Sequence, residues 1–226
     1  MIIDSHIHIG PSVSLGIDVK VEEVVEELER NGIDLALVMS FPSYAEYDER
    51  AANEMVLRAC EENENLFPIY CIGKPFPKKI PEEFVAIKWH WVGGVADLKS
   101  NYETLKREDL EDFVEKIDKP MFFEEEFTFT KIFLERFDVR VVIPHLGLLG
   151  GNPSDFLREF AENENVYFDT SLASPSQIKE FYETIPDRLI FGSDKPFGSI
   201  YHELRKVTEI CDERVLWKNA KKLFKL

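Results

Sequence analysis

Two histidines and an aspartate alternate near the start of the chain, in the segment DSHIH at residues 4–8. The segment is predicted to be a strand, in which side chains alternate between the two faces. One face then carries Asp4, His6 and His8, and the other carries Ile3, Ser5, Ile7 and Ile9. Burying two imidazoles and a carboxylate is unfavourable unless they are paired or bind a cation. The pattern therefore indicates a metal site, with a hydrogen-bonded pair of core histidines as the alternative.

A further aspartate, Asp194, ends the last apolar run of the chain in the sequence FGSD. If the strands close into a barrel, the last strand is the neighbour of the first, which places Asp194 beside His6 and His8. Three protein ligands with an open position match a catalytic metal site. An aspartate in this position also commonly caps a turn, and that alternative stays open.

The elements that must position these residues follow from hydrophobic periodicity. Segments with helical spacing, such as residues 21–32, alternate with apolar runs. Eight such runs are predicted to be strands, at residues 2–9, 35–41, 66–72, 84–91, 121–126, 140–147, 166–171 and 188–194. The alternation predicts an α/β fold, a (β/α)₈ TIM barrel that forms a single compact domain over residues 1–226. An open doubly wound sheet is the alternative, but no glycine-rich turn follows the first strand.

The charge of the chain narrows the classes of partner. It has 43 acidic and 27 basic residues and a formal net charge of −16, which disfavours nucleic acids and anionic membrane surfaces. No apolar run approaches the about 20 residues of a membrane-spanning helix, and the first residues are unlike a signal peptide. We expect a cytoplasmic protein with a small-molecule substrate and no nucleic-acid or membrane partner; a homo-oligomer is left open.

Five motifs resemble those of a known family, and they run in order along the chain: IIDSHIHIG, VVIPHLGLLGG, VYFDTS, RLIFGSDKPFG and VLWKNAKKLF. They look like the motifs of the amidohydrolase superfamily, in the amidohydrolase-2 branch that includes aminocarboxymuconate semialdehyde decarboxylase. The resemblance implies a metal-dependent barrel in which His6, His8 and Asp194 bind the ion. His145, at the end of the sixth strand, then binds a second metal or polarises the substrate carbonyl.

The chain departs from this family at the fifth strand, in KPMFFEEEF at residues 119–127. Family members usually carry a metal-binding histidine a few residues after the proline, and Glu124 stands at the matching place. Glutamate binds the same metals through oxygen, so Glu124 is predicted to be a fourth ligand. The alternative is that the three consecutive glutamates form a solvated strand end.

Polar residues on two other strands are candidates for contacts with substrate. Lys88 and His90 share one face of the fourth strand, where AIKWH looks like the GIKLH of the single-metal branch rather than a strand with a carboxylated lysine. We expect both to line the pocket or to bind an anionic substrate. Asp169 and Ser171 end the seventh strand, and they either hydrogen-bond substrate or close a turn.

The resemblance implies a hydrolase of a small amide, lactone or ester, in which the metal activates a water molecule. Asp194 would pass a proton from that water to the leaving group, and His145 would stabilise charge on the carbonyl oxygen. We expect one zinc ion, with manganese, iron, cobalt and nickel also suited. The alternatives are a metal-dependent decarboxylase of a small unsaturated acid, or a barrel without a catalytic metal that binds a small ligand.

Two other enzyme families open with a similar HxH motif. The TatD-type nucleases carry a glutamate on the fourth strand, where this chain has Lys88. Relatives of the polymerase-and-histidinol phosphatases need more histidines than the five present here. Both families fit the sequence less well.

Overall fold

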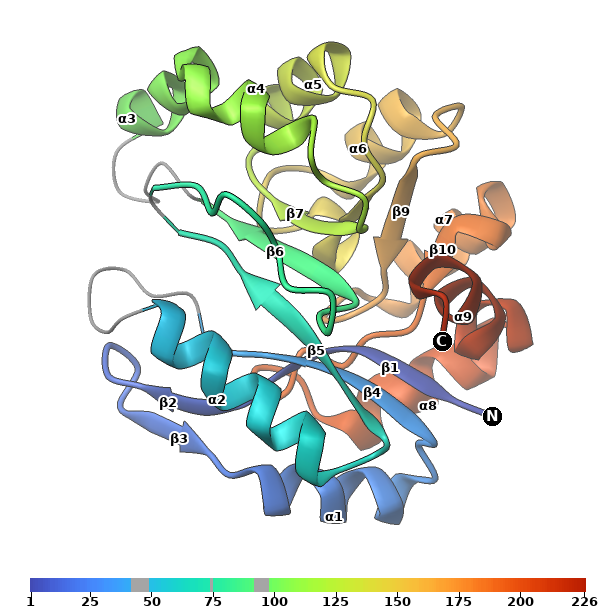
Figure 1. Cartoon of the computed structure of the whole chain (residues 1–226). Coiled ribbons are helices and arrows are strands. Elements are labelled where there is room, and N and C mark those ends of the chain that lie inside the picture. Colours follow the sequence, from blue (N-terminus) through green and yellow to red (C-terminus); the bar gives the residue numbers. More distant parts are fainter. Residues whose placement is uncertain (42–48, 74, 92–97) are drawn as a thin grey trace.

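The computed structural model of the chain describes residues 1–41, 49–73, 75–91 and 98–226 (Figure 1). Its main sheet has eight parallel strands arranged in chain order. These are β1 (Ile3–His8), β4 (Leu35–Met39), β5 (Leu66–Cys71), β6 (Ala86–His90), β7 (Met121–Glu124), β8 (Val141–Ile143), β9 (Val166–Asp169) and β10 (Leu189–Ile190). Each lies within a run that the sequence predicts to be a strand, and the α/β barrel is confirmed.

Backbone hydrogen bonds join the last strand to the first. The N–H of Ser5 donates to the carbonyl of Phe191 at 2.9 Å, and the N–H of Asp194 donates to the carbonyl of His6 at 2.7 Å. The buried carboxylate of Asp4 adds to the closure, because its Oδ1 accepts from the N–H of Ser193 at 2.9 Å. These bonds bring the start of the chain and residues 191–195 into one rim.

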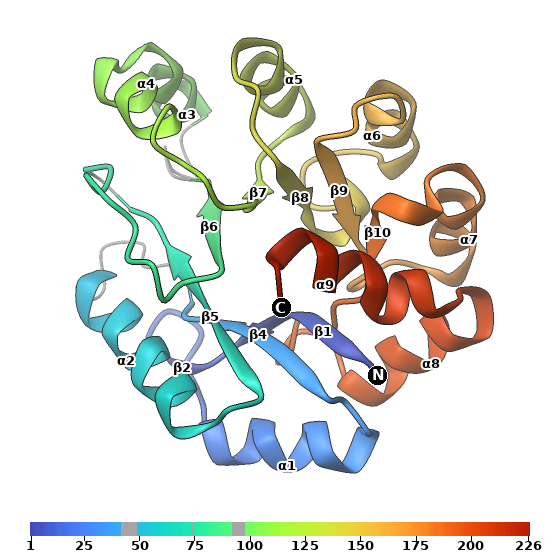
Figure 2. The same ribbon diagram turned by 45° about the vertical axis from the view of Figure 1, so that its right-hand side comes forward.

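Helices surround the strands (Figure 2). They are α1 (Val21–Asn31), α2 (Glu49–Glu62), α3 (Leu98–Glu103), α4 (Glu108–Val114), α5 (Phe127–Arg136), α6 (Pro153–Phe160), α7 (Pro175–Thr184) and α8 (Ile200–Ile210). Short helical turns span Thr104–Lys106, Pro144–Gly147, Pro186–Arg188 and Arg214–Lys218. The described residues between β5 and β6 contain no helix, so the alternation is interrupted there. Across the described ranges, no helix combines the length and the apolar character needed to cross a membrane.

The end of the barrel where the strands begin is filled with apolar side chains and covered by α9 (Asn219–Phe224). In Figure 2 this helix lies across the middle of the ring of strands. Phe224 stacks on Phe122 of β7, with ring centroids 5.7 Å apart and planes only 3° from parallel. The other buried members of this inner cluster are Ile3, Leu37, Met39, Ile69, Cys71, Ala86, Val142, Ile190, Ala220 and Leu223. His8, Glu124 and Asp169, the last residues of β1, β7 and β9, lie at the opposite end.

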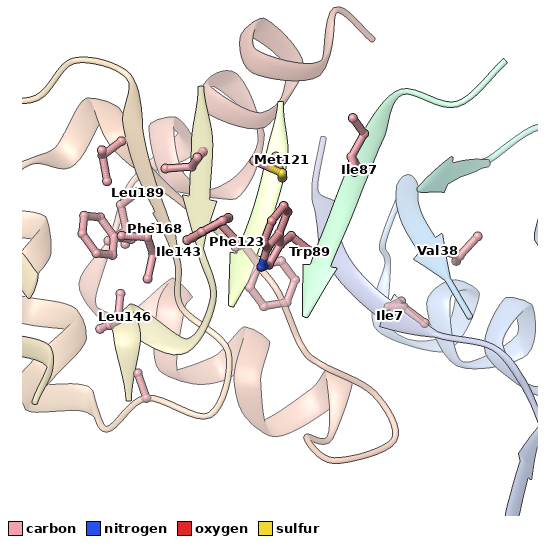
Figure 3. Close-up of a cluster of buried hydrophobic side chains, with 14 of the residues drawn as sticks. Ile7, Val38, Ile87, Trp89, Met121, Phe123, Ile143, Leu146, Phe168 and Leu189 are labelled. Carbon is pink, nitrogen blue, oxygen red and sulfur yellow. The ribbon is translucent and has the colours of Figure 1, made fainter. Parts of the chain in front are cut away.

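The outward faces of the strands form a second apolar cluster beneath the helices (Figure 3). Period-two alternation explains both clusters, since inner Ala86 and Phe122 are followed by outer Ile87 and Phe123. β1 departs from strict alternation, because its pairing with β4 shifts register between Asp4 and Ile7. The prediction that Ile3 shares a face with Ile7 is therefore wrong: Ile3 packs inside the barrel and Ile7 outside.

A small antiparallel hairpin follows β1 and is absent from the sequence-based prediction. It consists of β2 (Gly10–Ser12) and β3 (Ile17–Val19). Its turn includes Gly16 at φ 64°, a left-handed conformation that glycine adopts without a steric penalty. The hairpin begins directly after His8, so its turn lies near the end of the barrel where the polar residues gather.

Candidate active site

His6, His8 and Asp194 converge at the rim where β1 meets the segment after β10. The Nε2 atoms of both histidines lie 3.4 Å from Oδ1 of Asp194. All three residues are buried, and one potential ligand atom from each lies within 4.8 Å of the others. The structure thus brings together the three residues that the sequence places at opposite ends of the chain.

The hydrogen bonds of the two histidines assign their ring protons. Nδ1 of His6 lies 2.8 Å from Oδ2 of Asp169, and Nδ1 of His8 lies 3.1 Å from the carbonyl oxygen of Ser40. An ionised carboxylate and a carbonyl only accept, so each Nδ1 carries the proton and donates it. Burial, with Lys88 adding to it, lowers the pKa of His6, which favours its neutral form. The neutral ring of His6 then presents an Nε2 lone pair towards Asp194.

This arrangement is unfavourable without a cation. The Nε2 lone pair of His6 faces a carboxylate oxygen that is also an acceptor, and this nitrogen has no hydrogen-bond partner among the described residues. Burial would raise the pKa of Asp194, but the positive charge of the neighbouring histidines, when they are protonated, lowers it overall. Two imidazole nitrogens and one carboxylate oxygen are a common donor set for a catalytic divalent metal. The residues present therefore fit such an ion.

Asp169, at the end of β9, orients both His6 and His145. Its Oδ2 accepts from His6, while its Oδ1 accepts from the backbone N–H groups of His145 at 3.1 Å and Ser171 at 2.9 Å. Burial alone would raise the pKa of Asp169, but the charge and hydrogen bond of His6, the charge of His145 and the hydroxyl group of Ser171 lower it overall. Metal-binding histidines characteristically donate their second ring N–H to such a carboxylate. The sequence offered two simpler roles for Asp169, and only its place at a strand end indicated this one.

His145 lies between the two carboxylates that face the site. Its Nε2 is 3.9 Å from Oδ2 of Asp194 and 4.0 Å from Oε1 of Glu124. Its Nδ1 lies 2.8 Å from Oγ of Ser171, whose hydroxyl donates to Asp169. Ser171 therefore accepts from Nδ1 of His145, which leaves Nε2 free to take up a proton. The ring also stacks on His6 with centroids 5.2 Å apart.

Glu124 has a different environment. Its Oε2 lies 2.6 Å from Nζ of Lys88, and its Oε1 lies 3.3 Å from Nε2 of His90. Burial would raise the pKa of Glu124, but Lys88 and the two nearby histidines outweigh it and hold the pKa well below the usual range. Among the described residues, the two groups of converging metal donors do not include Glu124. A ligand role for Glu124 stays a prediction.

The three consecutive glutamates do not form a solvated strand end. Glu124 and Glu125 are both buried, and Glu125 accepts a hydrogen bond from Nε1 of Trp89 at 2.7 Å. Glu126 caps α5, because its carboxylate accepts from the N–H groups of Thr128 and Phe129. Each carboxylate thus has its own partner, which a run of identical residue types does not reveal.

A cavity of about 340 Å³ opens above these groups, a size suited to a small molecule. Aromatic rings form part of its wall, since Phe41 stacks on His8 at 5.0 Å and Phe197 meets His8 edge-on at 5.9 Å. The described lining contains neither lysine nor arginine, so Lys88 lies outside it. The lining residues are His8, Ser12, Ser14, Leu15, Phe41, His90, Glu124, His145, Leu149, Leu172, Asp194 and Phe197.

The C-terminal part of the chain is similar to a known protein family. Residues 127–226 match the profile of the family described as amidohydrolase. The predicted resemblance to the amidohydrolase family is confirmed. No sequence among the curated proteins is similar enough to count as a relative. The family match supports an enzyme and leaves its reaction open.

Several solved structures resemble the chain over its whole length. A 5-carboxyvanillate decarboxylase from Sphingomonas paucimobilis has a TM-score of 0.68 and 13% identity, with 100% of this chain and 99% of that chain covered. A dihydroxybenzoic acid decarboxylase from Polaromonas sp. JS666, with bound manganese and 2-nitroresorcinol, has a TM-score of 0.65 and 14% identity, covering 100% and 97%. A 2,6-dihydroxybenzoate decarboxylase from Rhizobium has a TM-score of 0.63 and 14% identity, covering 99% and 98%. At these identities the likeness establishes the fold.

The comparisons correct the predicted reaction. Hydrolysis of an amide, lactone or ester is the wrong main prediction, because the similar structures with a named reaction are decarboxylases. The same donor residues serve both reactions, so the metal-site motifs alone could not separate them. A divalent metal agrees with the site geometry, whereas the choice of zinc has no specific support.

Proposed function

We propose that the protein is a metal-dependent decarboxylase of a small unsaturated or aromatic carboxylic acid. One divalent ion is held by His6, His8 and Asp194. The observation that carries this proposal is the convergence of the Nε2 atoms of His6 and His8 on Oδ1 of Asp194, 3.4 Å from each, beside a cavity walled in part by aromatic rings. The decarboxylases with the same fold supply the reaction class.

For the ion we propose manganese, with zinc as the second candidate. Two imidazoles and a carboxylate suit both metals. Manganese is favoured because the structurally similar enzyme from Polaromonas contains it. The donors come from residues 6 to 194, so we also propose that residues 1–226 act as a single domain.

Decarboxylation breaks the bond between the carboxylate and its carbon, releases carbon dioxide and requires a proton at that carbon. A bound divalent ion supplies positive charge that attracts the substrate carboxylate and stabilises charge as it develops. Phe41 and Phe197 provide flat apolar surfaces beside His8 for an unsaturated or aromatic group. The substrate is thereby placed with its carboxylate towards Asp194.

His145 is the residue we propose to hold the transferred proton. Ser171 keeps the ring proton of His145 on Nδ1, so an additional proton enters at Nε2 on the cavity side. The ionised carboxylate of Asp194, 3.9 Å away, stabilises the protonated ring. His145 then donates this proton to the carbon that loses carbon dioxide, and solvent restores it.

The test is release of carbon dioxide by protein loaded with Mn²⁺. The substrates are 2,6-dihydroxybenzoate, 5-carboxyvanillate and a set of unsubstituted benzoic and acrylic acids. We expect carbon dioxide from at least one acid, its loss after chelation and its return when Mn²⁺ is added. Absence of release from every acid by fully loaded protein would overturn the reaction. Failure to bind any divalent ion would favour the barrel that binds a small ligand without a catalytic metal.

A further inference from the structure

Lys88 is a buried cation that the proposed reaction does not use. Only 1% of its surface is exposed, and its Nζ lies 2.6 Å from Oε2 of Glu124. In the pairing of β6 with β7, Lys88 is opposite Phe122 while His90 is opposite Glu124. Lys88 is two residues before His90, the last residue of β6. It therefore reaches the carboxylate of Glu124 from deeper inside the barrel. Glu124 faces the cavity, and Lys88 supports it from behind.

The two oxygens of Glu124 have separate environments as a result. Oε2 is occupied by the ammonium group of Lys88, which leaves Oε1 towards His90 and His145 on the cavity side. Glu124 does not converge with the donor atoms of His6, His8 and Asp194, and moving its carboxylate towards them would draw Oε2 away from Nζ of Lys88. A buried ammonium group would then be left without its partner, which is strongly unfavourable.

We infer that Lys88 is a positioning residue which keeps Glu124 away from the ion and fixes it as a hydrogen-bond acceptor for the substrate. This inference rests on the proposed function, because it takes the ion to be held by His6, His8 and Asp194. It differs from the prediction that Glu124 replaces the family histidine as a fourth ligand. The two assignments predict opposite effects on metal binding.

Glu124 in this position also determines which substrate groups fit on its side of the cavity. A substrate whose carboxylate lies at the ion presents its far side to Oε1 of Glu124. An ionised carboxylate accepts hydrogen bonds and repels a second anion. The preferred substrate is therefore a monocarboxylate with a hydroxyl or amino group on the side facing Glu124. A dicarboxylate with its second acid at that place is disfavoured.

The first experiment measures Mn²⁺ affinity by calorimetry in the wild type, Glu124→Gln and the double variant Lys88→Met/Glu124→Gln. The double variant removes both charges together, so it preserves the charge balance of the buried pair. We expect both variants to bind Mn²⁺ within about twofold of the wild type, whereas loss of a true ligand exceeds the about 10- to 100-fold loss seen for its supporting residues. A loss of that size would overturn the inference and establish Glu124 as a ligand.

The second experiment compares binding of benzoate, its three monohydroxy derivatives and isophthalate to the Mn²⁺-loaded proteins. The wild type should prefer at least one hydroxybenzoate over benzoate by about tenfold, the usual size of one hydrogen bond to a charged group, and should disfavour isophthalate. In the double variant, the affinity for benzoate should be unchanged, and the affinities for the hydroxybenzoates and isophthalate should become about equal to it. Unchanged preferences in the double variant would overturn the inference.

A matched control is the exposed ion pair between Lys131 on α5 and Glu159 on α6. Neither residue lines the cavity, so Lys131→Met/Glu159→Gln removes the same charges outside the lining and should leave both Mn²⁺ affinity and probe preference unchanged. Failure of the wild type to bind Mn²⁺ or benzoate would overturn the proposed function itself. A different result would overturn only the inference about Lys88 and Glu124. In that case the wild type binds both Mn²⁺ and benzoate, but its preference among the probes is unchanged in the double variant.

Discussion

The two sides of the cavity handle buried polar groups in opposite ways. On the side of β1 and β10, the Nε2 atoms of His6 and His8 both lie 3.4 Å from Oδ1 of Asp194. On the side of β6 and β7, the carboxylate of Glu124 already has a cation, Lys88, at 2.6 Å. The first group contains a buried nitrogen, Nε2 of His6, that has no hydrogen-bond partner among the described residues, whereas the second has its counter-charge within the chain. Because of this difference, we propose a metal site on one side and a hydrogen-bonding surface on the other.

The largest effect on the proposed metal site is expected when both imidazoles are removed. His6→Ala/His8→Ala leaves Asp194 as the single donor of the proposed set, so Mn²⁺ affinity should fall by more than about 100-fold. Metal analysis after dialysis, combined with calorimetry, provides the measurement. His202→Ala, on the exposed face of α8, is the control and should keep the full metal content. Retention of tight Mn²⁺ binding by the double variant would place the metal elsewhere.

Breaking the ion pair between Lys88 and Glu124 should lower the stability of the protein. Lys88→Met leaves the buried carboxylate of Glu124 without its cation and should lower the free energy of unfolding by about 3–5 kcal/mol. Lys88→Met/Glu124→Gln removes both charges and should recover most of that loss. Urea denaturation of the metal-free proteins measures both values. If the single variant is as stable as the double variant, the pair does not provide mutual compensation.

The orientation of His6 provides a sharper test of the metal side. Asp169→Asn replaces the acceptor for Nδ1 of His6 with an amide that no longer enforces the same ring proton position. We expect Mn²⁺ affinity to fall by about 10- to 100-fold with the fold retained. Calorimetry gives the affinity, and circular dichroism checks the fold. Asp187→Asn, an exposed carboxylate, should bind Mn²⁺ like the wild type.

The smallest expected effect concerns the aromatic wall. Phe197→Ala removes an edge-on contact with His8 and part of the surface for an aromatic substrate. Binding of benzoate to Mn²⁺-loaded protein should weaken by about 2- to 10-fold, corresponding to about 0.5–1.5 kcal/mol for one aromatic contact. Mn²⁺ affinity should not change. Phe197→Leu keeps the bulk without the ring and should lie between the two proteins.

Sequence periodicity was sufficient for the framework and for the residues at the two ends of the chain. Strand runs and their order predicted the barrel, and closure of the barrel predicted that Asp194 meets His6 and His8. The dual role of Asp169 depends on a contact with His6 across 163 positions, which local pattern cannot specify. The pairing of Lys88 with Glu124 depends likewise on strand register.

Two further features could not be predicted from the sequence because of local irregularities. The hairpin of β2 and β3 has strands of only three residues each, too short for an alternating pattern to stand out. The register shift within β1 reversed the expected position of Ile3 because periodicity assumes an unbroken strand. The reaction was misassigned for a chemical reason, since a metal bound by imidazole and carboxylate supports more than one type of bond cleavage.

The rim between β1 and residues 191–195 also has a consequence for synthesis of the protein. Asp4 and Ser193, which hydrogen-bond across this rim, are 189 positions apart in the chain. A nascent chain therefore exposes two histidines long before the ribosome adds the aspartate that completes the donor set. Tight loading of the proposed ion has to wait until residue 194 has been synthesised, and a product truncated before it lacks one of the three proposed ligands.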